Sequence, residues 1–127
     1  MSTATAVKAF SLWLSERCAF LQGLEQEAGR VLQEKKDTEK YHALMRQKAV
    51  FLMGLPAEAA SRMEGLPEEA AATVSSRLER FSQSAARALE LDSVFYMYAL
   101  LYPDEHVKGQ PNNLELLAAE IASLAGK

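Results

Sequence analysis

The sequence contains a single cysteine, Cys18, so no disulfide can form within the chain. It also lacks a long apolar run, because the longest, residues 94–102, is far shorter than the roughly 18 residues of a membrane-spanning helix. The first residues lack the apolar centre of a signal peptide. We therefore expect a cytoplasmic protein without a membrane span, in which Cys18 is a buried thiol within an apolar stretch.

A basic excess, the usual mark of a nucleic-acid-binding protein, is also missing. The formal net charge is −3, and the 14 basic residues are spread along the chain. The one local cluster contains Lys35, Lys36, Lys40, Arg46 and Lys48. On a helix these side chains point in several directions. We interpret the cluster as solvated surface and expect no nucleic-acid partner.

No pattern of residues indicates catalysis or a bound cofactor. The six glycines are scattered singly, so they form no phosphate-binding loop. Glu39 and His42 have the Glu-x-x-His spacing of di-iron bundles, but such bundles need two copies, and the only other histidine, His106, has no such partner. No motif around Cys18 pairs it with either histidine. We expect a protein that is not an enzyme and that binds neither a metal nor a cofactor.

What the sequence does contain is an ordinary globular share of apolar residues. Hydrophobic residues make up 49% of the 127 positions and charged residues 24%. A chain of this length buries about two thirds of its unfolded surface, so folding requires no disulfide or metal. We expect a single helical domain over residues 1–127.

The spacing of the apolar residues predicts helices. A first helix is expected over residues 4–35, and Trp13 and Phe20 widen its apolar face. The junction that follows holds no glycine or proline, so either a second helix begins at Asp37 or Thr38, or the first continues straight through. The stripe of the first helix consists of Val7, Phe10, Leu14, Leu21, Leu24, Ala28 and Val31.

The second stripe predicts a helix that ends before Pro56, since proline lacks a donor and restricts the residue before it. It consists of Tyr41, Leu44, Met45, Lys48, Phe51, Leu52 and Leu55. A short helix is expected over residues 56–64 and a third long helix from Pro67, because each copy of Gly-Leu-Pro resembles a helix start.

The C-terminal part predicts two further helical segments. Residues 94–102 are expected to form a helix that ends at Pro103, and a last helix, capped by Asn112 or Asn113, is closed by Gly126. The fold class is therefore all-α, an elongated bundle of long antiparallel helices with about four helices and one short one. The last stripe consists of Leu114, Leu117, Ile121 and Leu124.

The aromatic segment is the most distinctive candidate for a binding surface. It is apolar or aromatic on all sides, so it is either buried against several neighbours or in contact with a partner. Tyrosine suits interfaces because one end of the side chain is apolar and the other polar, and methionine adapts to varied surfaces. The candidate partner-binding residues are Phe95, Tyr96, Met97, Tyr98, Tyr102, Met45 and Phe51.

We expect a non-catalytic helical module for protein–protein interaction. The first helix is longer than a domain of this size can cover, which predicts a homo-oligomer or another protein partner. A second interpretation is a ligand-binding or regulatory bundle with a pocket near residues 96–102. A partner-binding protein exposes contiguous apolar surface, whereas a ligand-binding protein encloses a cavity with a few polar groups.

The stretch that begins with Leu32 and continues through the polar junction to Leu55 resembles the small helical export chaperones of the bacterial flagellar secretion system. In that family a long helix passes a polar junction and leads into the form Leu-x-x-x-Lys-x-x-Leu-Leu-x-x-Leu. Here Leu44, Lys48, Phe51, Leu52 and Leu55 occupy these places, with Phe51 as the first of the paired leucines. The resemblance covers about a third of the chain. It implies a cytoplasmic export chaperone that binds a helix of a secreted partner.

Overall fold

The computed structural model describes residues 2–126, and none of these residues belongs to a strand. The all-α class is therefore confirmed. The elements in chain order are α1 (Thr3–Arg30), η1 (Val31–Lys35), α2 (Thr38–Ala60), α3 (Glu68–Glu90), α4 (Val94–Ala99), α5 (Asn113–Ser123) and η2 (Leu124–Gly126). None of these helices is both long and apolar enough to cross a membrane.

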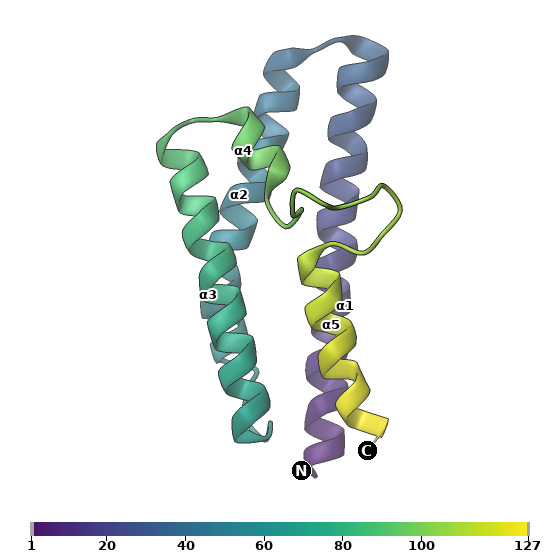
Figure 1. Ribbon diagram of the computed structural model, residues 1–127, viewed down its shortest axis with the longest axis vertical. Coiled ribbons are helices and arrows are strands. Elements are labelled where there is room, and N and C mark those ends of the chain that lie inside the picture. Colours follow the sequence, from purple (N-terminus) through teal and green to yellow (C-terminus); the bar gives the residue numbers. More distant parts are fainter. Residues whose placement is uncertain (1, 127) are drawn as a thin grey trace.

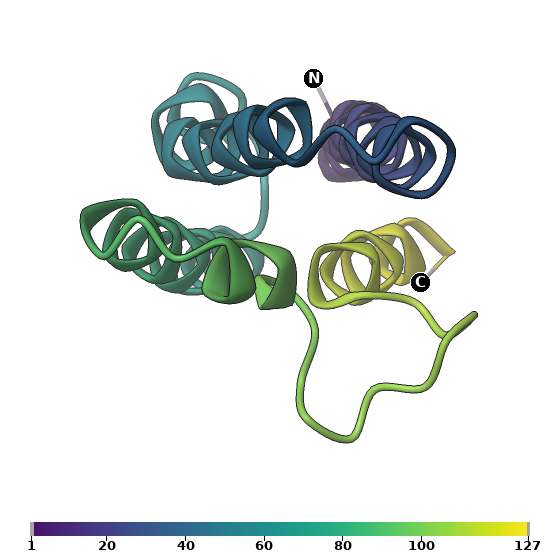
Figure 2. The same ribbon diagram turned by 90° about the horizontal axis from the view of Figure 1, so that it is seen from above.

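The helices form two layers. α1 and α2 run side by side in opposite directions, joined by a short turn at one end of the molecule (Figure 1). α3 packs on α2, and α5 packs on α1. Seen from above, α1 and α2 make one layer, and α3, α4 and α5 make the other (Figure 2). The expected elongated bundle of long antiparallel helices is thus what the chain forms.

A single hydrophobic core lies between the layers, and every α-helix contributes to it. The apolar stripes of α1, α2, α3 and α5 face inward with the 3–4 spacing expected from the sequence. The largest fully buried apolar side chains of this core are Phe10, Leu14, Leu21, Met45, Leu52, Leu55, Leu78, Met97, Leu114, Leu117 and Ile121.

The junction between the first two helices is a break. η1 widens the last turn of α1, and Lys36 then adopts the left-handed conformation with a φ of 52°. Asp37 begins the next helix, since its carboxylate accepts a hydrogen bond of 3.0 Å from the backbone N–H of Lys40. Of the two alternatives, a new helix starting here is the one observed.

The short helix expected over residues 56–64 does not form, so that expectation is wrong. α2 continues past Pro56 to its end, with this proline inside the helix. Because Pro56 lacks an N–H, α2 loses one hydrogen bond near its C-terminal end. The continued helix keeps Leu55 and Ala59 buried. A turn containing Gly65, with a φ of 88°, then leads to Pro67 and α3, as expected.

The helix expected over residues 94–102 is shorter than predicted, since α4 comprises only Val94–Ala99. α4 ends at Ala99, because Leu101 adopts a φ of 75° and Pro103 restricts the residue before it. Leu100 and Leu101 are buried beside the end of the helix. The last helix, α5, begins as expected after Asn112, whose side chain forms a capping box with Glu115.

The left-handed residue between α1 and α2 gives a test of this break. Lys36→Gly should raise the free energy of unfolding by about 0.5–1 kcal/mol, because glycine adopts a positive φ without a steric penalty. Urea unfolding of the variant measures the change. Lys8→Gly, in the second turn of α1 and exposed, is the control and should lower stability by about 1 kcal/mol. A loss of stability in Lys36→Gly would mean that the two helices are continuous.

Candidate functional site

Three aromatic side chains of α4 point into solvent. Phe95 is 73% exposed, Tyr98 60% and Tyr96 53%. Ser93 starts this helix by accepting a hydrogen bond of 3.1 Å from the N–H of Tyr96. Successive residues turn by 100°, so a helix of six residues that buries Met97 must point its neighbours elsewhere. We call Phe95, Tyr96 and Tyr98 the α4 surface.

The other four candidate residues lie elsewhere. Met97 and Met45 are buried in the core, which corrects the expectation that they contact a partner. Tyr102 is half-buried, and its hydroxyl bonds within the protein. Phe51 is half-buried in a groove on the far side of α2 from the α4 surface. Sequence reasoning therefore placed in one cluster residues that the structure divides between the core and two surfaces.

α4 is fastened to the long helices by a buried ionic network. The fully buried ammonium of Lys48, in α2, donates to Oε2 of Glu25, in α1, at 3.0 Å, and to the backbone carbonyl of Tyr98 at 2.9 Å. The hydroxyl of Tyr102 donates to the same carboxylate, with its oxygen 2.7 and 2.8 Å from the two carboxylate oxygens. The ammonium also lies 4.9 Å from the centroid of the Tyr102 ring.

The protonation equilibria of this network reflect its burial. Burial lowers the pKa of Lys48, and the attraction of Glu25 only partly offsets that effect. The pKa of Tyr102 is raised far above its usual range, first by burial and then by the hydrogen bond to Glu25. The tyrosine is therefore a neutral donor at physiological pH, and the carboxylate is its acceptor.

The network is an anchor rather than a reaction centre. The carbonyl of Tyr98 belongs to the last turn of α4, where carbonyls lack helical partners and a positive charge is favourable. Lys48 supplies both a donor and that charge, and no face of its side chain is open to a substrate. The interpretation of Lys48 as part of a solvated basic cluster is therefore wrong, although its position on the apolar stripe of its helix was a sequence signal for burial.

A second surface lies along the outer side of the α1 and α2 layer. Two hollows follow one another there, with volumes of about 310 and 390 Å³. The first is lined by Ala9, Leu12, Trp13, Glu16, Arg17, Glu58 and Arg62. The second is lined by Phe20, Leu24, Arg46, Gln47, Val50 and Phe51. We call the two together the α1/α2 groove.

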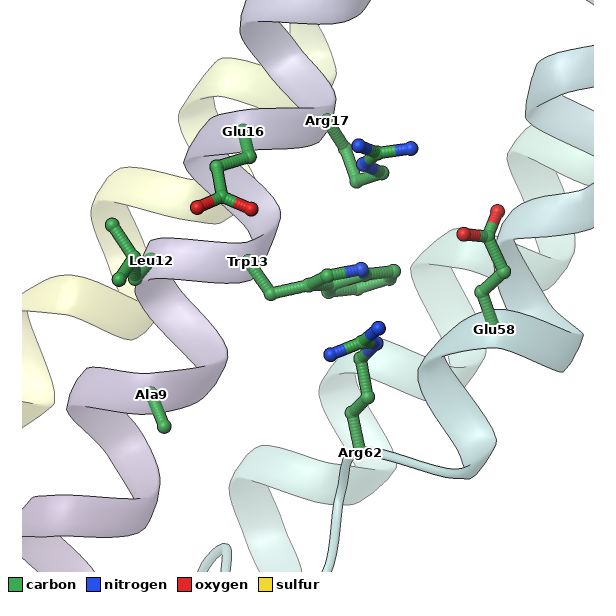
Figure 3. A pocket seen from close by; sticks show the side chains of 7 residues that line it. All are labelled: Ala9, Leu12, Trp13, Glu16, Arg17, Glu58 and Arg62. Carbon is green, nitrogen blue, oxygen red and sulfur yellow. The ribbon is translucent and has the colours of Figure 1, made fainter.

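Arginine side chains cover aromatic rings in the α1/α2 groove. The guanidinium of Arg62 lies 5.3 Å from the centroid of the Trp13 ring. Figure 3 shows this indole between Arg62 and Arg17. Arg17 in turn lies 5.7 and 5.9 Å from the ring centroids of Phe20 and Phe51, which contact each other at 4.9 Å. The sequence identified Trp13, Phe20 and Phe51 as apolar residues, but it did not indicate that arginine side chains would cover their rings.

His42, which was considered for metal binding, instead contacts a carboxylate of the protein. Nε2 of His42 lies 2.9 Å from Oδ1 of Asp92, and Arg46 donates to the same carboxylate. The hydrogen bond from Arg46 is the main reason that the pKa of Asp92 is lowered, and His42 adds to it. In the described part of the chain, no group of three or more His, Cys, Asp and Glu side chains is placed to hold a metal.

Cys18, expected to be a buried thiol, is partly buried against the core. Burial raises the pKa of its thiol to about 11, and the negative charge of Glu115 adds to the effect. The thiolate is the reactive form, so burial disfavours the reactive form of this cysteine at neutral pH.

Comparison of the chain with models of known protein families, with curated proteins and with solved structures gave no match.

The buried network gives a stability prediction. Glu25→Gln leaves the charge of Lys48 buried without its counterion, which should lower the free energy of unfolding by on the order of 3 kcal/mol. Combining it with Lys48→Met should recover most of the loss, because the uncompensated charge is then gone. Glu27→Gln, which breaks an exposed ion pair with Arg30, is the control and should leave stability nearly unchanged. A double variant as unstable as Glu25→Gln would contradict this account.

The raised pKa of Tyr102 predicts a dependence on alkaline pH. The unfolded chain releases this proton near pH 10, whereas the folded chain retains it to higher pH. The stability that Tyr102 contributes is therefore present below about pH 10 and is lost as the pH rises further. The advantage of the wild type over Tyr102→Phe should shrink above pH 10 in thermal unfolding. The pKa of Tyr41 is also raised, but Tyr41 is present in both the wild type and the Tyr102→Phe variant, so it does not contribute to their difference. A constant difference would refute the assignment.

Proposed function

We propose that this protein is a non-catalytic helical module for protein–protein interaction, and that the α4 surface binds its partner. The observation that carries the proposal is the exposure of Phe95, Tyr96 and Tyr98 on a helix of six residues. Aromatic side chains of this size are costly to leave in water and are enriched in the centres of protein interfaces.

The geometry of α4 supports binding at this place. The buried network holds the carbonyl of Tyr98 and the side chain of Tyr102, so the exposed rings project from a fixed backbone. Phe95 and Tyr96 contact each other edge to face, with ring centroids 5.7 Å apart. A rigid anchor loses less conformational entropy on binding than a flexible one, which favours affinity.

The partner is a second copy of the chain or another protein. A narrower form of the proposal is a cytoplasmic export chaperone that binds a helix of a secreted partner in a bacterial flagellar system. That form rests on the resemblance of the segment containing Leu44, Lys48 and Leu55. In the structure these three side chains are buried, so they support the architecture of the bundle and leave binding to other residues.

The alternative, a ligand pocket near residues 96–102, has less support. Neither hollow of the α1/α2 groove is lined by Tyr96, Tyr98 or Tyr102. The hydroxyl of Tyr102, the polar group best placed to orient a ligand, already donates to Glu25.

Replacing the exposed rings tests the proposal. Phe95→Ser combined with Tyr96→Ser should change the free energy of unfolding by less than about 1 kcal/mol, because both side chains are exposed. Binding should weaken by about tenfold or more, as expected for aromatic residues central to an interface. The measurements are sedimentation velocity for self-association and quantitative affinity capture from the cells of origin for other partners.

Leu116→Ser is the matched control, since Leu116 is also an exposed apolar side chain but belongs to α5. It should leave the captured partners and the oligomeric state as in the wild type. If the double serine variant captures the same partners in the same amounts and associates equally, the α4 surface is not the binding site.

A further inference from the structure

α4 connects two points of the bundle that are fixed by contacts outside the helix itself. At its start, the N–H of Ser93 donates to the carbonyl of Ala88 at 3.1 Å, which closes the end of α3. At its end, the carbonyl of Leu101 accepts from the N–H of Asn113 at 3.0 Å, and the hydroxyl of Tyr102 donates to a carboxylate of α1. Within residues 2–126, α4 packs on α2 and α3 alone among the helices (Figure 1). We call residues 93–100 the α4 strap.

The turn before the α4 strap contains a residue in a conformation that favours glycine. Asp92 has a φ of 49°, at the position after a helix end where glycine is common because it has no Cβ. The N–H groups of Asp92 and Ser93 bond back to the carbonyls of Leu89 and Ala88, which is the pattern of a Schellman motif. An aspartate at this place is disfavoured relative to glycine, so this turn is strained.

The turn after the α4 strap is strained as well. Leu100 has a φ of −55° and a ψ of 133°, and Leu101 has a φ of 75°. The N–H of Tyr102 donates to the carbonyl of Ala99 at 3.0 Å, which completes a type II turn. The third residue of such a turn is normally glycine or asparagine. Leucine is disfavoured there by roughly five- to thirtyfold in population, because its Cβ approaches a backbone oxygen.

Contacts with α2 hold the α4 strap in place against this strain. The carboxylate of Asp92 accepts a hydrogen bond of 2.9 Å from the guanidinium of Arg46 and lies 2.9 Å from Nε2 of His42. Glycine, which the turn favours, would form neither contact. At the other end, Lys48 of the same helix donates to the carbonyl of Tyr98 at 2.9 Å. We call the contacts of Asp92 with Arg46 and His42 the latch.

The length of the α4 strap allows it to leave α2 while its two ends stay in place. Residues 93–100 span about 12 Å as a helix and up to roughly 27 Å when extended. A strap that unwinds therefore bows outward without moving α3 or α5. Opening relaxes both strained turns, and it exposes the buried side chains of Met97 and Leu100 to water. The first effect favours opening and the second opposes it.

From these observations we infer that α4 is a hinged strap, which opens from α2 about Asp92 and Leu101 while the long helices stay folded. The closed position is the main state, and the latch sets how often the strap opens. The inference rests on the proposed function and concerns the regulation of that site. Only the closed strap presents Phe95, Tyr96 and Tyr98 from a fixed backbone, so opening withdraws the α4 surface.

Amide hydrogen exchange of the full chain measures this opening without a partner. The N–H of Met97 reports on the α4 strap, because it donates to the carbonyl of Ser93 at 2.9 Å. The N–H groups of Leu14 and Leu52, at buried positions of α1 and α2, report on unfolding of the bundle. At low urea concentrations, Met97 should exchange at least about a hundredfold faster than these two. Its exchange should also depend less on urea, because a local opening exposes little surface.

Asp92→Asn tests the latch, because asparagine also adopts the left-handed conformation but carries no charge. The substitution should raise the exchange rate of the Met97 N–H by about fivefold, since a hydrogen bond between charged groups is stronger than its neutral counterpart. Glu27→Gln, which breaks an exposed ion pair within α1, is the matched control and should leave this rate unchanged.

Leu101→Gly and Leu101→Ala together test the second hinge. The two variants remove the same buried side chain to within one methyl group, and only glycine relieves the strained φ. The Met97 N–H should therefore exchange about fivefold more slowly in the glycine variant than in the alanine variant.

Three results would overturn the inference: the same urea dependence for Met97 as for Leu14 and Leu52, exchange in Asp92→Asn equal to that of the wild type, or equal exchange in the two Leu101 variants. None of these measurements involves a partner. If Phe95→Ser with Tyr96→Ser retains binding, the proposed function fails, whereas the exchange results still decide whether the strap opens. Failure of the proposed function and failure of the strap are therefore distinguished.

Discussion

The burial of one positive charge determines how this bundle is assembled. Lys48 is fully buried, and a buried ammonium is stable only where acceptors surround it. Its acceptors come from Glu25, 23 positions earlier, and from the carbonyl of Tyr98, 50 positions later. Because both lie within about 3 Å of one nitrogen, α1, α2 and α4 must meet at a single level of the bundle.

The two candidate surfaces follow from this arrangement. α4 is held through its last turn and buries Met97, so its three remaining aromatic rings point away from the core. The α1 and α2 pair is covered on one side only, which leaves Phe20 and Val50 exposed along the other. The two surfaces belong to different layers of the bundle.

Local patterns predicted the helices well, and contacts between distant residues were harder to foresee. The stripes of α1 and α5 and the Asn112 cap depend on neighbours within a few residues, so the sequence revealed them. Pro56 was misjudged because the packing of Leu55 and Ala59 outweighs one lost hydrogen bond. Lys48 was visible as a charge on an apolar stripe, but nothing in the sequence indicated which residues would pair with it.

The balance of energies in the network explains what it contributes. The pKa of Lys48 is lowered although Glu25 attracts its charge, so the cost of burial exceeds the gain from the ion pair. Replacing a buried ion pair by apolar side chains of similar size is often nearly neutral for stability, but an apolar side chain has no specific acceptor to meet. The ammonium of Lys48, in contrast, is satisfied only where α4 brings the Tyr98 carbonyl beside Glu25. We therefore attribute to Lys48 the placement of the α4 surface rather than the stability of the fold.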